Sequence, residues 1–407
     1  MNANRTETAD CVVVGGGPAG LMLGVLLARA GVDTLVLEKH ADFLRDFRGD
    51  TIHPSTQDAL ADMGLLDEFL ALPHADLPRV MLRYGGRDLV LADFSRLPTR
   101  RKAIAFLPQW DFLDLLARAG SREPRFRLLR RTRGVEPITE GERVVGVRAE
   151  GPGGAFEVRA RLVVAADGRD SDVRAAAGMV PRRIASAMDV LWFRLPKDPR
   201  ETQPFVQAGD GTLIVIDRGE FFQIAHVIPA GTWTADADGL VAMRARVSRL
   251  SPAMEERVGA LGLDDVKLLT VRLERLRRWH RDGLLAIGDA AHAMSPAGGV
   301  GINLAIQDAI ATANALAPIL RERRPSMREL ARVRRRRELP TAIIQRVQHA
   351  LQDPLLAPAR SSRIPLPLRA LQRLPFLRHV TGRIVGVGIR PERVRSNQPR
   401  RGARSTK

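Results

Sequence analysis

The chain has 407 residues, 45% of them hydrophobic and 27% charged, with one cysteine and a formal net charge of +18. These values describe a globular protein with ample core-forming material, and they exclude an intramolecular disulfide and a cysteine-based metal cluster; we predict no metal site and a cytoplasmic location. Residues 321–407 hold 23 of the 64 Lys and Arg residues but only 5 of the 46 acidic ones, so the rest of the chain is electrically balanced and gives no electrostatic case for nucleic-acid binding.

A βαβ unit opens the chain. The stretch DCVVVGGGPAGLMLGVLLARAGVDTLVLEKH predicts a buried strand at residues 11–14, a glycine turn, a helix over residues 21–30 and a second strand in DTLVLE. Such a unit predicts an α/β fold with a parallel sheet. Short strands near residues 76–102 and 183–268 interrupt the α/β series, which indicates one sheet domain built from three pieces with a second, β-rich domain inserted.

The remaining elements follow in order along the chain. We expect helices over residues 55–72, 109–120, 237–260 and 301–320, and buried strands at residues 161–166 and in GLLAIGDAAH. From residue 331 the tail reads as helix interrupted by prolines at 340, 354, 358, 365, 367 and 375.

The glycine turn of the first unit matches G-x-G-x-x-G. Gly15 permits the tight turn, Gly17 lets the backbone approach a pyrophosphate, and Gly20 lets helix and strand pack closely. Glu38 ends the second strand, where a carboxylate can accept hydrogen bonds from a ribose. The motif predicts a dinucleotide, without choosing between FAD and NAD.

Two further motifs each follow a buried strand. Asp167 ends a strand in LVVAADGRDSDVRAAAG, at the sheet edge where α/β folds place ligands, although Asp-Gly alone often marks only a turn. In IGDAAHAMSPAGGVGINLAIQDA, Asp289 ends a strand, and Pro296 and three glycines precede a helix. A helix start lined by glycines suits a large, flat anionic group such as a reduced flavin. For His292 we favour a role in buttressing the Asp289 turn over catalysis.

Taken together, the three motifs resemble those of the FAD-dependent class A aromatic monooxygenases, the para-hydroxybenzoate hydroxylase-like family. The resemblance covers roughly residues 8–390 and rests on GGGPAG, AADGRDSDVR and the stretch from IGDAAH to QDA. It implies a Rossmann-like FAD-binding domain of the glutathione reductase type at residues 1–75, 103–182 and 268–330, a β-sheet substrate domain at 76–102 and 183–267, and a basic helical segment at 331–407.

The resemblance also implies which residues bind the cofactor. The residue matching Glu38 holds the adenosine ribose, those matching Gln109 and Asp289 contact the ribityl chain, and the one matching Asp167 serves both flavin and nicotinamide. The implied cofactor-binding residues are Gly15, Gly17, Pro18, Ala19, Gly20, Glu38, Lys39, Arg48, Gln109, Asp167, Asp289, Pro296, Gly299, Val300, Gly301, Ile302 and Asn303.

The implied reaction is hydroxylation of an aromatic or polycyclic small molecule. In the family, NADH or NADPH reduces FAD, and dioxygen then forms a flavin C4a-hydroperoxide that transfers the hydroxyl group. The implied partners are the aromatic substrate, dioxygen and a transient NAD(P)H, with the protein a monomer or homodimer. The absence of a second G-x-G-x-x-G agrees with a nicotinamide that has no domain of its own.

This sequence departs from the family in the residues that would act on the substrate. It has one tyrosine, Tyr84, so a relay of tyrosines that removes a phenolic proton is not available. His226 is the candidate general base. An alternative of equal weight is that His226 is a structural residue on a sheet face whose ring nitrogens are hydrogen-bonded within the protein. Pro296 is the second candidate for the catalytic centre. Because the sequence offers few polar residues as candidates for contact with the substrate, we expect an apolar or larger aromatic substrate.

Other functions stay open at this point. One enzymatic alternative is a halogenase or an isoprenoid reductase on the same fold, although the Trp-x-Trp-x-Ile-Pro signature of tryptophan-type halogenases is missing. A non-enzymatic alternative is a flavin- or lipid-binding protein whose basic tail contacts an acidic partner or a membrane surface weakly. For the tail, we favour a helical cap that packs on the body and closes the site.

Overall fold

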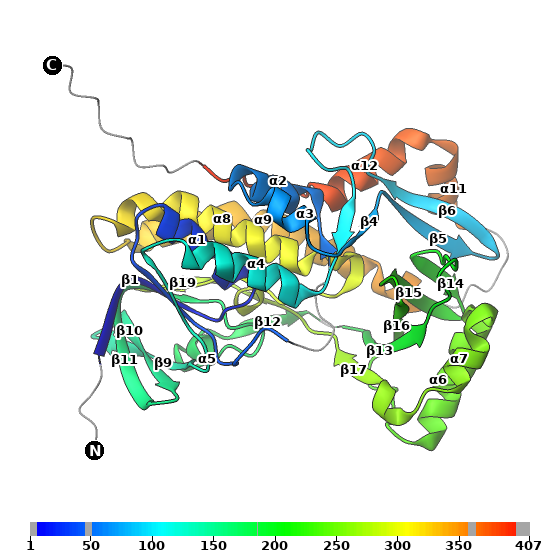
Figure 1. Cartoon of the computed structure of the whole chain (residues 1–407), viewed down its shortest axis with the longest axis horizontal. Coiled ribbons are helices and arrows are strands. Elements are labelled where there is room, and N and C mark those ends of the chain that lie inside the picture. Colours follow the sequence, from blue (N-terminus) through cyan, green and yellow to red (C-terminus); the bar gives the residue numbers. More distant parts are fainter. Residues whose placement is uncertain (1–5, 45–50, 185, 357–363, 396–407) are drawn as a thin grey trace.

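A largely parallel sheet forms the larger part of the molecule (Figure 1). The computed structural model describes residues 6–44, 51–184, 186–356 and 364–395. The strand order is β19-β20-β11-β1-β2-β8, with β10 and β9 continuing antiparallel from β11. Strands β20, β11, β1, β2 and β8 run parallel to their neighbours in this series, as the opening βαβ unit predicts. The bounds are β1 (Thr6–Val14), β2 (Thr34–Leu37), β8 (Phe126–Leu129), β9 (Arg133–Glu140), β10 (Arg143–Gly151), β11 (Gly154–Ala165), β19 (His280–Arg281) and β20 (Leu284–Ala286).

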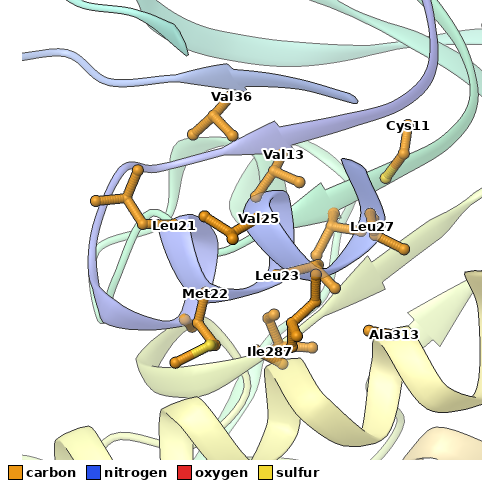
Figure 2. Packing of buried hydrophobic residues seen from close by; sticks show 14 of the residues in the cluster. Cys11, Val13, Leu21, Met22, Leu23, Val25, Leu27, Val36, Ile287 and Ala313 are labelled. Atoms are coloured by element: carbon orange, nitrogen blue, oxygen red, sulfur yellow. The ribbon is translucent and has the colours of Figure 1, made fainter. Parts of the chain in front are cut away.

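Helix α1 (Pro18–Arg29) lies between this sheet and helix α8 (Gly301–Leu320). It is apolar on nearly every side because both of its faces are covered. Figure 2 shows Val13 and Val36 of the sheet on one side of α1, and Ile287 and Ala313 on the other. The four-residue runs that end β1 and β11 are fully apolar for the same reason.

A second, seven-stranded sheet carries the opposite side of the molecule. Its order is β17-β13-β16-β15-β14-β5-β6, and only the β14–β5 pair is parallel. The bounds are β5 (Arg79–Tyr84), β6 (Arg87–Asp93), β13 (Met188–Pro196), β14 (Val206–Gly209), β15 (Gly211–Asp217), β16 (Phe221–Pro229) and β17 (Lys267–Thr270). Two small sheets complete the strands: β3 (Thr51–Ile52) and β4 (Ala75–Leu77) pair with β7 (Ile104–Phe106), and β12 (Pro181–Ile184) pairs with β18 (Leu273–Leu276).

The helices correct the predictions in three places. The stretch 55–72 is two helices, because Gly64 adopts a φ of +69° between them, and 237–260 breaks at Pro252. The prediction that proline interrupts the tail at residue 340 is wrong: α9 runs through Pro340, with Leu330, Val333 and other residues buried against the body to hold it. The bounds are α2 (Pro54–Asp62), α3 (Leu66–Leu70), α4 (Gln109–Ser121), α5 (Asp172–Ala176), α6 (Ala237–Leu250), α7 (Glu255–Gly259), α9 (Met327–Ala350) and α10 (Gln352–Leu356).

The C-terminal helices α11 (Leu366–Arg373) and α12 (Pro375–Gly386) pack on β6 of the second sheet (Figure 1). The Thr381 hydroxyl donates to the Leu91 carbonyl at 2.6 Å, and the Gln372 amide donates to the Val90 carbonyl at 3.1 Å. These contacts agree with the cap expected for the tail. Among the described helices, none is both long and apolar enough to cross a membrane.

The packing of α1 leaves no room for a side chain at Gly24. A Cβ at Gly24 would lie 2.7 Å from Val36 Cγ2 and 2.8 Å from the Phe126 ring. We predict that Gly24→Ala lowers the free energy of unfolding by about 1–3 kcal/mol, because it overpacks the core. Denaturant unfolding measures this. Gly259→Ala is the control, since a Cβ there meets nothing within 4 Å; equal stability of the two variants would contradict the packing argument.

Candidate functional site

A cavity of about 1650 Å³ lies between the two large sheets. One end, which we call the dinucleotide half, is lined by the carboxyl ends of β1, β2 and β11 and by the start of α8. The other end, which we call the apolar half, is lined by β5–β7, by β13–β17, by Leu351 and Leu355, and by C-terminal residues between 365 and 385. The parallel strands place their ends at one edge, where α/β folds bind ligands.

The glycine turn after β1 forms the floor of the dinucleotide half. Gly15 adopts a φ of +107°, and a Cβ there would collide with the backbone of Ala166 and Asp167. A Cβ at Gly20 would collide with the Gly15 carbonyl, so Gly20 serves the packing of helix on turn. Gly17 differs, because a Cβ there meets nothing within 4 Å and points into open space. The turn therefore leaves a backbone cradle above Gly17, at the N-terminus of α1.

Glu38 is fixed beside this cradle. Its carboxylate accepts the Gly16 N–H at 2.9 Å and the His40 N–H at 2.8 Å. The side chain is 4% exposed and lines the cavity. Two backbone bonds hold the carboxylate in one orientation, at the position where the motif predicts a ribose contact.

Asp167 follows β11 and lines the cavity. Both of its carboxyl oxygens are buried, with the Ser171 hydroxyl and the Val173 backbone as their polar neighbours. Burial raises the pKa of this carboxyl above its usual range. Asp167 thus lines the cavity as a residue, while its carboxyl oxygens are shielded from the open space.

Two glycines shape the start of α8. Gly298 and Gly299 adopt φ angles of +80° and +61°, and the Gly299 carbonyl accepts the Thr51 hydroxyl at 2.7 Å. Asn303 ties the first turn of α8 to the start of α2, since its side-chain oxygen accepts the His53 N–H at 2.9 Å and the Thr56 hydroxyl at 2.7 Å. The glycine-lined wall is thus held rigidly.

Most residues predicted to bind the cofactor meet at the cavity. The predicted residues that line it are Gly15, Gly17, Pro18, Ala19, Glu38, Lys39, Gln109, Asp167, Asp289, Pro296, Gly299, Gly301 and Ile302. Gly20, Val300 and Asn303 lie outside the lining, and the first and last of these shape it from behind. Arg48 lies outside the described residues.

His226 does not reach the cavity. Its strand neighbours Ala225 and Val227 line the cavity, so the alternation of β16 turns His226 to the other face, near Gly211 and under α6. Burial lowers the pKa of His226 to about 4. The catalytic role of His226 stays a prediction that this location does not favour. Pro296 lines the cavity, and its catalytic role also stays a prediction.

Several lining residues escaped the sequence-based predictions. Trp110, beside Gln109, and Thr132 and Arg133, at the start of β9, line the dinucleotide half, as do Met294 and Ser295. Arg133 stands in an arginine-rich stretch where no single arginine is distinctive. Trp110 could have been predicted from the sequence, because it adjoins a predicted cofactor-binding residue, Gln109, at the start of a helix.

The dinucleotide half fits FAD. The open cradle at Gly17 accommodates a pyrophosphate, Glu38 lies at the ribose position, and Asp167 lines the same cavity. The glycine-lined start of α8 offers a flat surface beside Asp289.

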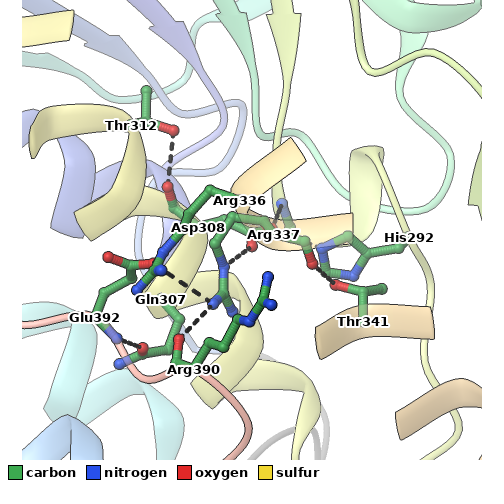
Figure 3. A network of polar contacts seen from close by, with 10 residues as sticks. His292, Gln307, Asp308, Thr312, Arg336, Arg337, Thr341, Arg390 and Glu392 are labelled. Carbon is green, nitrogen blue, oxygen red and sulfur yellow. Dashed lines mark hydrogen bonds and ion pairs between the residues drawn. The ribbon is translucent and has the colours of Figure 1, made fainter. Parts of the chain in front are cut away.

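A buried ionic network supports this half from behind (Figure 3). Asp308 of α8 is fully buried, and its carboxylate accepts the Arg337 Nε–H at 2.9 Å, lies 2.6 Å from His292 Nε2 and accepts the Gly288 N–H at 3.1 Å. Burial acts to raise the pKa of Asp308, but His292 and Arg337 outweigh it and hold the pKa below its usual range. Gly288 precedes Asp289, so the network fixes the turn that presents Asp289, and His292 has the buttressing role predicted for it.

Comparison with known proteins supports the same cofactor. The profile of a protein family described as FAD binding domain matches residues 8–347. A 6-methylpretetramide 4-monooxygenase from Streptomyces rimosus is 36% identical over 396 residues, which cover 95% of this chain and 94% of that protein.

Solved structures share the fold. Anhydrotetracycline hydroxylase from Streptomyces rimosus matches with a TM-score of 0.76 at 23% identity, covering 94% of this chain and 76% of that one. A myxobacterial chondrochloren halogenase matches with a TM-score of 0.73 at 22% identity, covering 95% and 98% of the two chains. The fold alone therefore does not separate hydroxylation from halogenation.

Gly17 allows a direct test of the cofactor cradle. We predict that Gly17→Ala leaves the stability of the flavin-free protein unchanged, because the new methyl group meets open space, but weakens FAD binding at least tenfold by filling the cradle. Fluorescence titration with FAD and thermal unfolding of the flavin-free protein measure the two effects. Gly20→Ala is the matched comparison and should destabilise the fold itself. Unaltered FAD affinity in Gly17→Ala would place the pyrophosphate elsewhere.

The ionic network predicts a large effect from one arginine. We expect Arg337→Gln to lower the free energy of unfolding at neutral pH by about 3–5 kcal/mol, because it leaves a buried carboxylate short of its counter-charge. Since the pKa of Asp308 is lowered in the folded protein, its ionised form stabilises the fold at neutral pH, and the deficit should shrink as pH falls and Asp308 is protonated.

The control for Arg337→Gln lies on the same helix. Arg334 and Glu338 form a partly exposed i,i+4 pair on α9, so Arg334→Gln should cost less than about 0.5 kcal/mol. Equal losses in the two variants, or a pH-independent loss in Arg337→Gln, would contradict the role given to Asp308.

Proposed function

This chain belongs to the FAD-dependent aromatic monooxygenases, and from that premise we propose that its substrate is a neutral polycyclic aromatic molecule. The enzyme oxidises NAD(P)H and places one atom of dioxygen on its substrate. Bound FAD supplies the redox chemistry and the activation of dioxygen. What this chain contributes is the shape, polarity and dryness of the chamber beside the flavin site.

The observation that carries the proposal is the character of the apolar half. Among the described residues of its strands and C-terminal helices that line it, none is Asp, Glu, Lys, Arg or His. At its edge, Arg169 from the loop after β11 donates to the Thr270 carbonyl at 3.2 Å. Its walls are mainly aliphatic and aromatic, with Val190, Trp192, Ile214 and Phe205 as examples. A charged substrate would lose its hydration there without gaining a counter-charge, whereas a neutral ring system buries apolar surface favourably.

The extent of the apolar half supports a substrate with more than one ring. The apolar half extends from β13 and β16 to the C-terminal helices, where Leu368, Leu371 and Val385 form its far wall. The relative with 36% identity is, by its name, an enzyme that oxidises 6-methylpretetramide. For this chain we propose the same class of substrate, a polycyclic aromatic molecule, and not the same compound.

The chamber determines which catalytic help is available. No described carboxylate or imidazole lines the apolar half, so a phenolic proton finds no side-chain base on those walls. An apolar environment also favours the neutral phenol over the phenolate. The side chains of this half therefore orient the substrate and exclude water, and the electron-rich ring provides its own reactivity.

The alternatives are less favoured. A halogenase shares the fold at 22% identity, whereas a relative that is 36% identical over 95% of this chain is a monooxygenase. A non-enzymatic flavin- or lipid-binding role leaves the enclosed apolar half beside the FAD site unexplained.

We also propose the domain division and the partners that the sequence suggests. The second sheet draws its strands from residues 79–93 and 188–270, which supports a substrate domain at 76–102 and 183–267 inserted into an FAD-binding domain. A weak contact with anionic membranes is supported by exposed apolar residues among the arginines of the tail, namely Leu366, Leu374, Phe376, Val380 and Ile384. We further propose a cytoplasmic location, which the lone buried cysteine supports, and a monomeric or homodimeric state.

Substrate-dependent oxidation of NADPH tests the proposed substrate class. With FAD bound, 1-naphthol and 1,8-dihydroxyanthraquinone should accelerate NADPH oxidation, whereas the 4-hydroxybenzoate anion should not. Ala225→Asp should abolish the acceleration while FAD remains bound, because it places a carboxylate in the apolar half, and Ala225→Val controls for added bulk. Acceleration by 4-hydroxybenzoate but by neither polycycle would overturn the proposal.

A further inference from the structure

Helix α9 buries two glutamines, Gln345 and Gln348, against the body of the protein. They are three residues apart, so they lie on the same face of the helix, and they are 1% and 2% exposed. A helix usually packs on a protein body through apolar residues, because an amide loses its hydration when it is buried. Buried amides are therefore expected to be hydrogen-bonded, and the partners of these two show what this face of α9 does.

The Gln348 amide binds one short segment of backbone. Its Nε2 group donates to the Ser295 carbonyl and to the Ala297 carbonyl, each at 2.8 Å, and its Oε1 accepts the Ser295 N–H at 3.2 Å. Both N–H donors and the acceptor oxygen are thus engaged. A carboxylate of the same shape would have no donor for the two carbonyls. The backbone on both sides of Pro296 is therefore attached to α9.

This segment, residues 295–297, lies where the two halves of the cavity meet. All three of its residues line the cavity, and Pro296 and Ala297 are only half-buried. The Pro296 carbonyl accepts the Gly299 N–H at 3.0 Å, which ties the segment to the glycine-lined start of α8. Ala297 packs on the other side against apolar residues of β13 and β16. A displacement of the segment would therefore move the wall of both halves.

Gln345 has similar bonds to a different part of the chain. Its Nε2 group donates to the Glu274 carbonyl at 2.9 Å and to the Ala293 carbonyl at 3.1 Å. The lining of the cavity, as far as the structure describes it, includes neither Glu274 nor Ala293. The two glutamines are thus alike in burial and in the kind of partner, but only the partners of Gln348 form the cavity wall.

We propose that Gln348 is a positioning residue for the flavin: it holds the backbone on both sides of Pro296 and thereby sets the wall beside which FAD binds. The inference does not depend on the class of the substrate. Gln348 does not itself line the cavity, so it acts through residues 295–297 and not by contact with the cofactor. The C-terminal part of the chain thus serves the flavin site through a buried amide as well as through its charged pairs.

Two substitutions on the same helix separate this role from general packing. Gln348→Met and Gln345→Met keep the length of the side chain but remove both amide donors. Thermal unfolding measures the stability of each variant. Fluorescence titration with FAD, at a temperature at which each variant is folded, measures the affinity for the cofactor. The visible absorbance spectrum of the bound flavin reports its surroundings independently of turnover.

Both variants should lose stability to a similar extent, because each leaves two buried carbonyls without the amide. Only Gln348→Met should weaken FAD binding, roughly tenfold, and shift the visible absorbance of the bound flavin. Gln345→Met should bind FAD as the wild type does, with the same spectrum. Wild-type FAD affinity in Gln348→Met would overturn the inference. Equal weakening in the two variants would also overturn it, because the effect would then follow from the packing of α9 in general.

Hydrogen exchange in the FAD-loaded wild type covers the case in which Gln348→Met does not fold. Ser295 lies outside the helices and strands, so its N–H would exchange quickly without a partner. The bond to Gln348 Oε1 predicts slow exchange, comparable with that of the Glu274 N–H, which donates to the Ala293 carbonyl at 3.1 Å. Exchange at Ser295 as fast as in an unstructured peptide would overturn the inference.

Discussion

The buried charge of Asp308 is the interaction on which the site depends. It lies on α8, directly behind the Gly288–Asp289 turn, and it is neutralised from α9 by Arg337. A carboxylate without exposure to water is tolerated only when it is paired and hydrogen-bonded, so α8, α9 and the turn are held in one arrangement. The network extends to the C-terminal segment, because the Glu392 N–H donates to Gln307 of α8 and Arg336 pairs with Glu392 (Figure 3).

This constraint links the two halves of the cavity. The chain that leaves α9 continues into the helices that close the apolar half, while the turn held by Asp308 belongs to the dinucleotide half. Residues 321–407, which carry the whole net charge of the protein, therefore also supply a wall of the apolar half through apolar side chains such as Leu368 and Leu371. Their arginines contribute to the structure through pairs such as Arg393 with Asp58 at 2.8 Å.

The sequence was most informative where local backbone chemistry dictates structure. A glycine turn between an apolar run and a helix has few conformations available, and so Gly15, Gly17, Glu38, Asp167 and Asp289 were predicted to approach one another, and the structure brings them to one cavity. Side-chain direction on the second sheet was not predictable, because β16 is mostly apolar and buried on both faces, and its alternation gives no sign of which face meets the cavity. This is why His226 was a candidate for the site although it lies on the face turned away from the cavity. Pro340 shows the same limit, since tertiary packing overrides the local rule.

The most direct test of the account is the fate of dioxygen. The FAD-loaded enzyme is supplied with NADPH, 1-naphthol and isotopically labelled dioxygen, and the products are analysed by mass spectrometry. A monooxygenase with a dry chamber beside its flavin should yield a hydroxylated product that carries one labelled oxygen atom, in an amount that matches the NADPH consumed. NADPH consumption that yields only hydrogen peroxide, or a hydroxylated product whose new oxygen comes from water, would contradict the account.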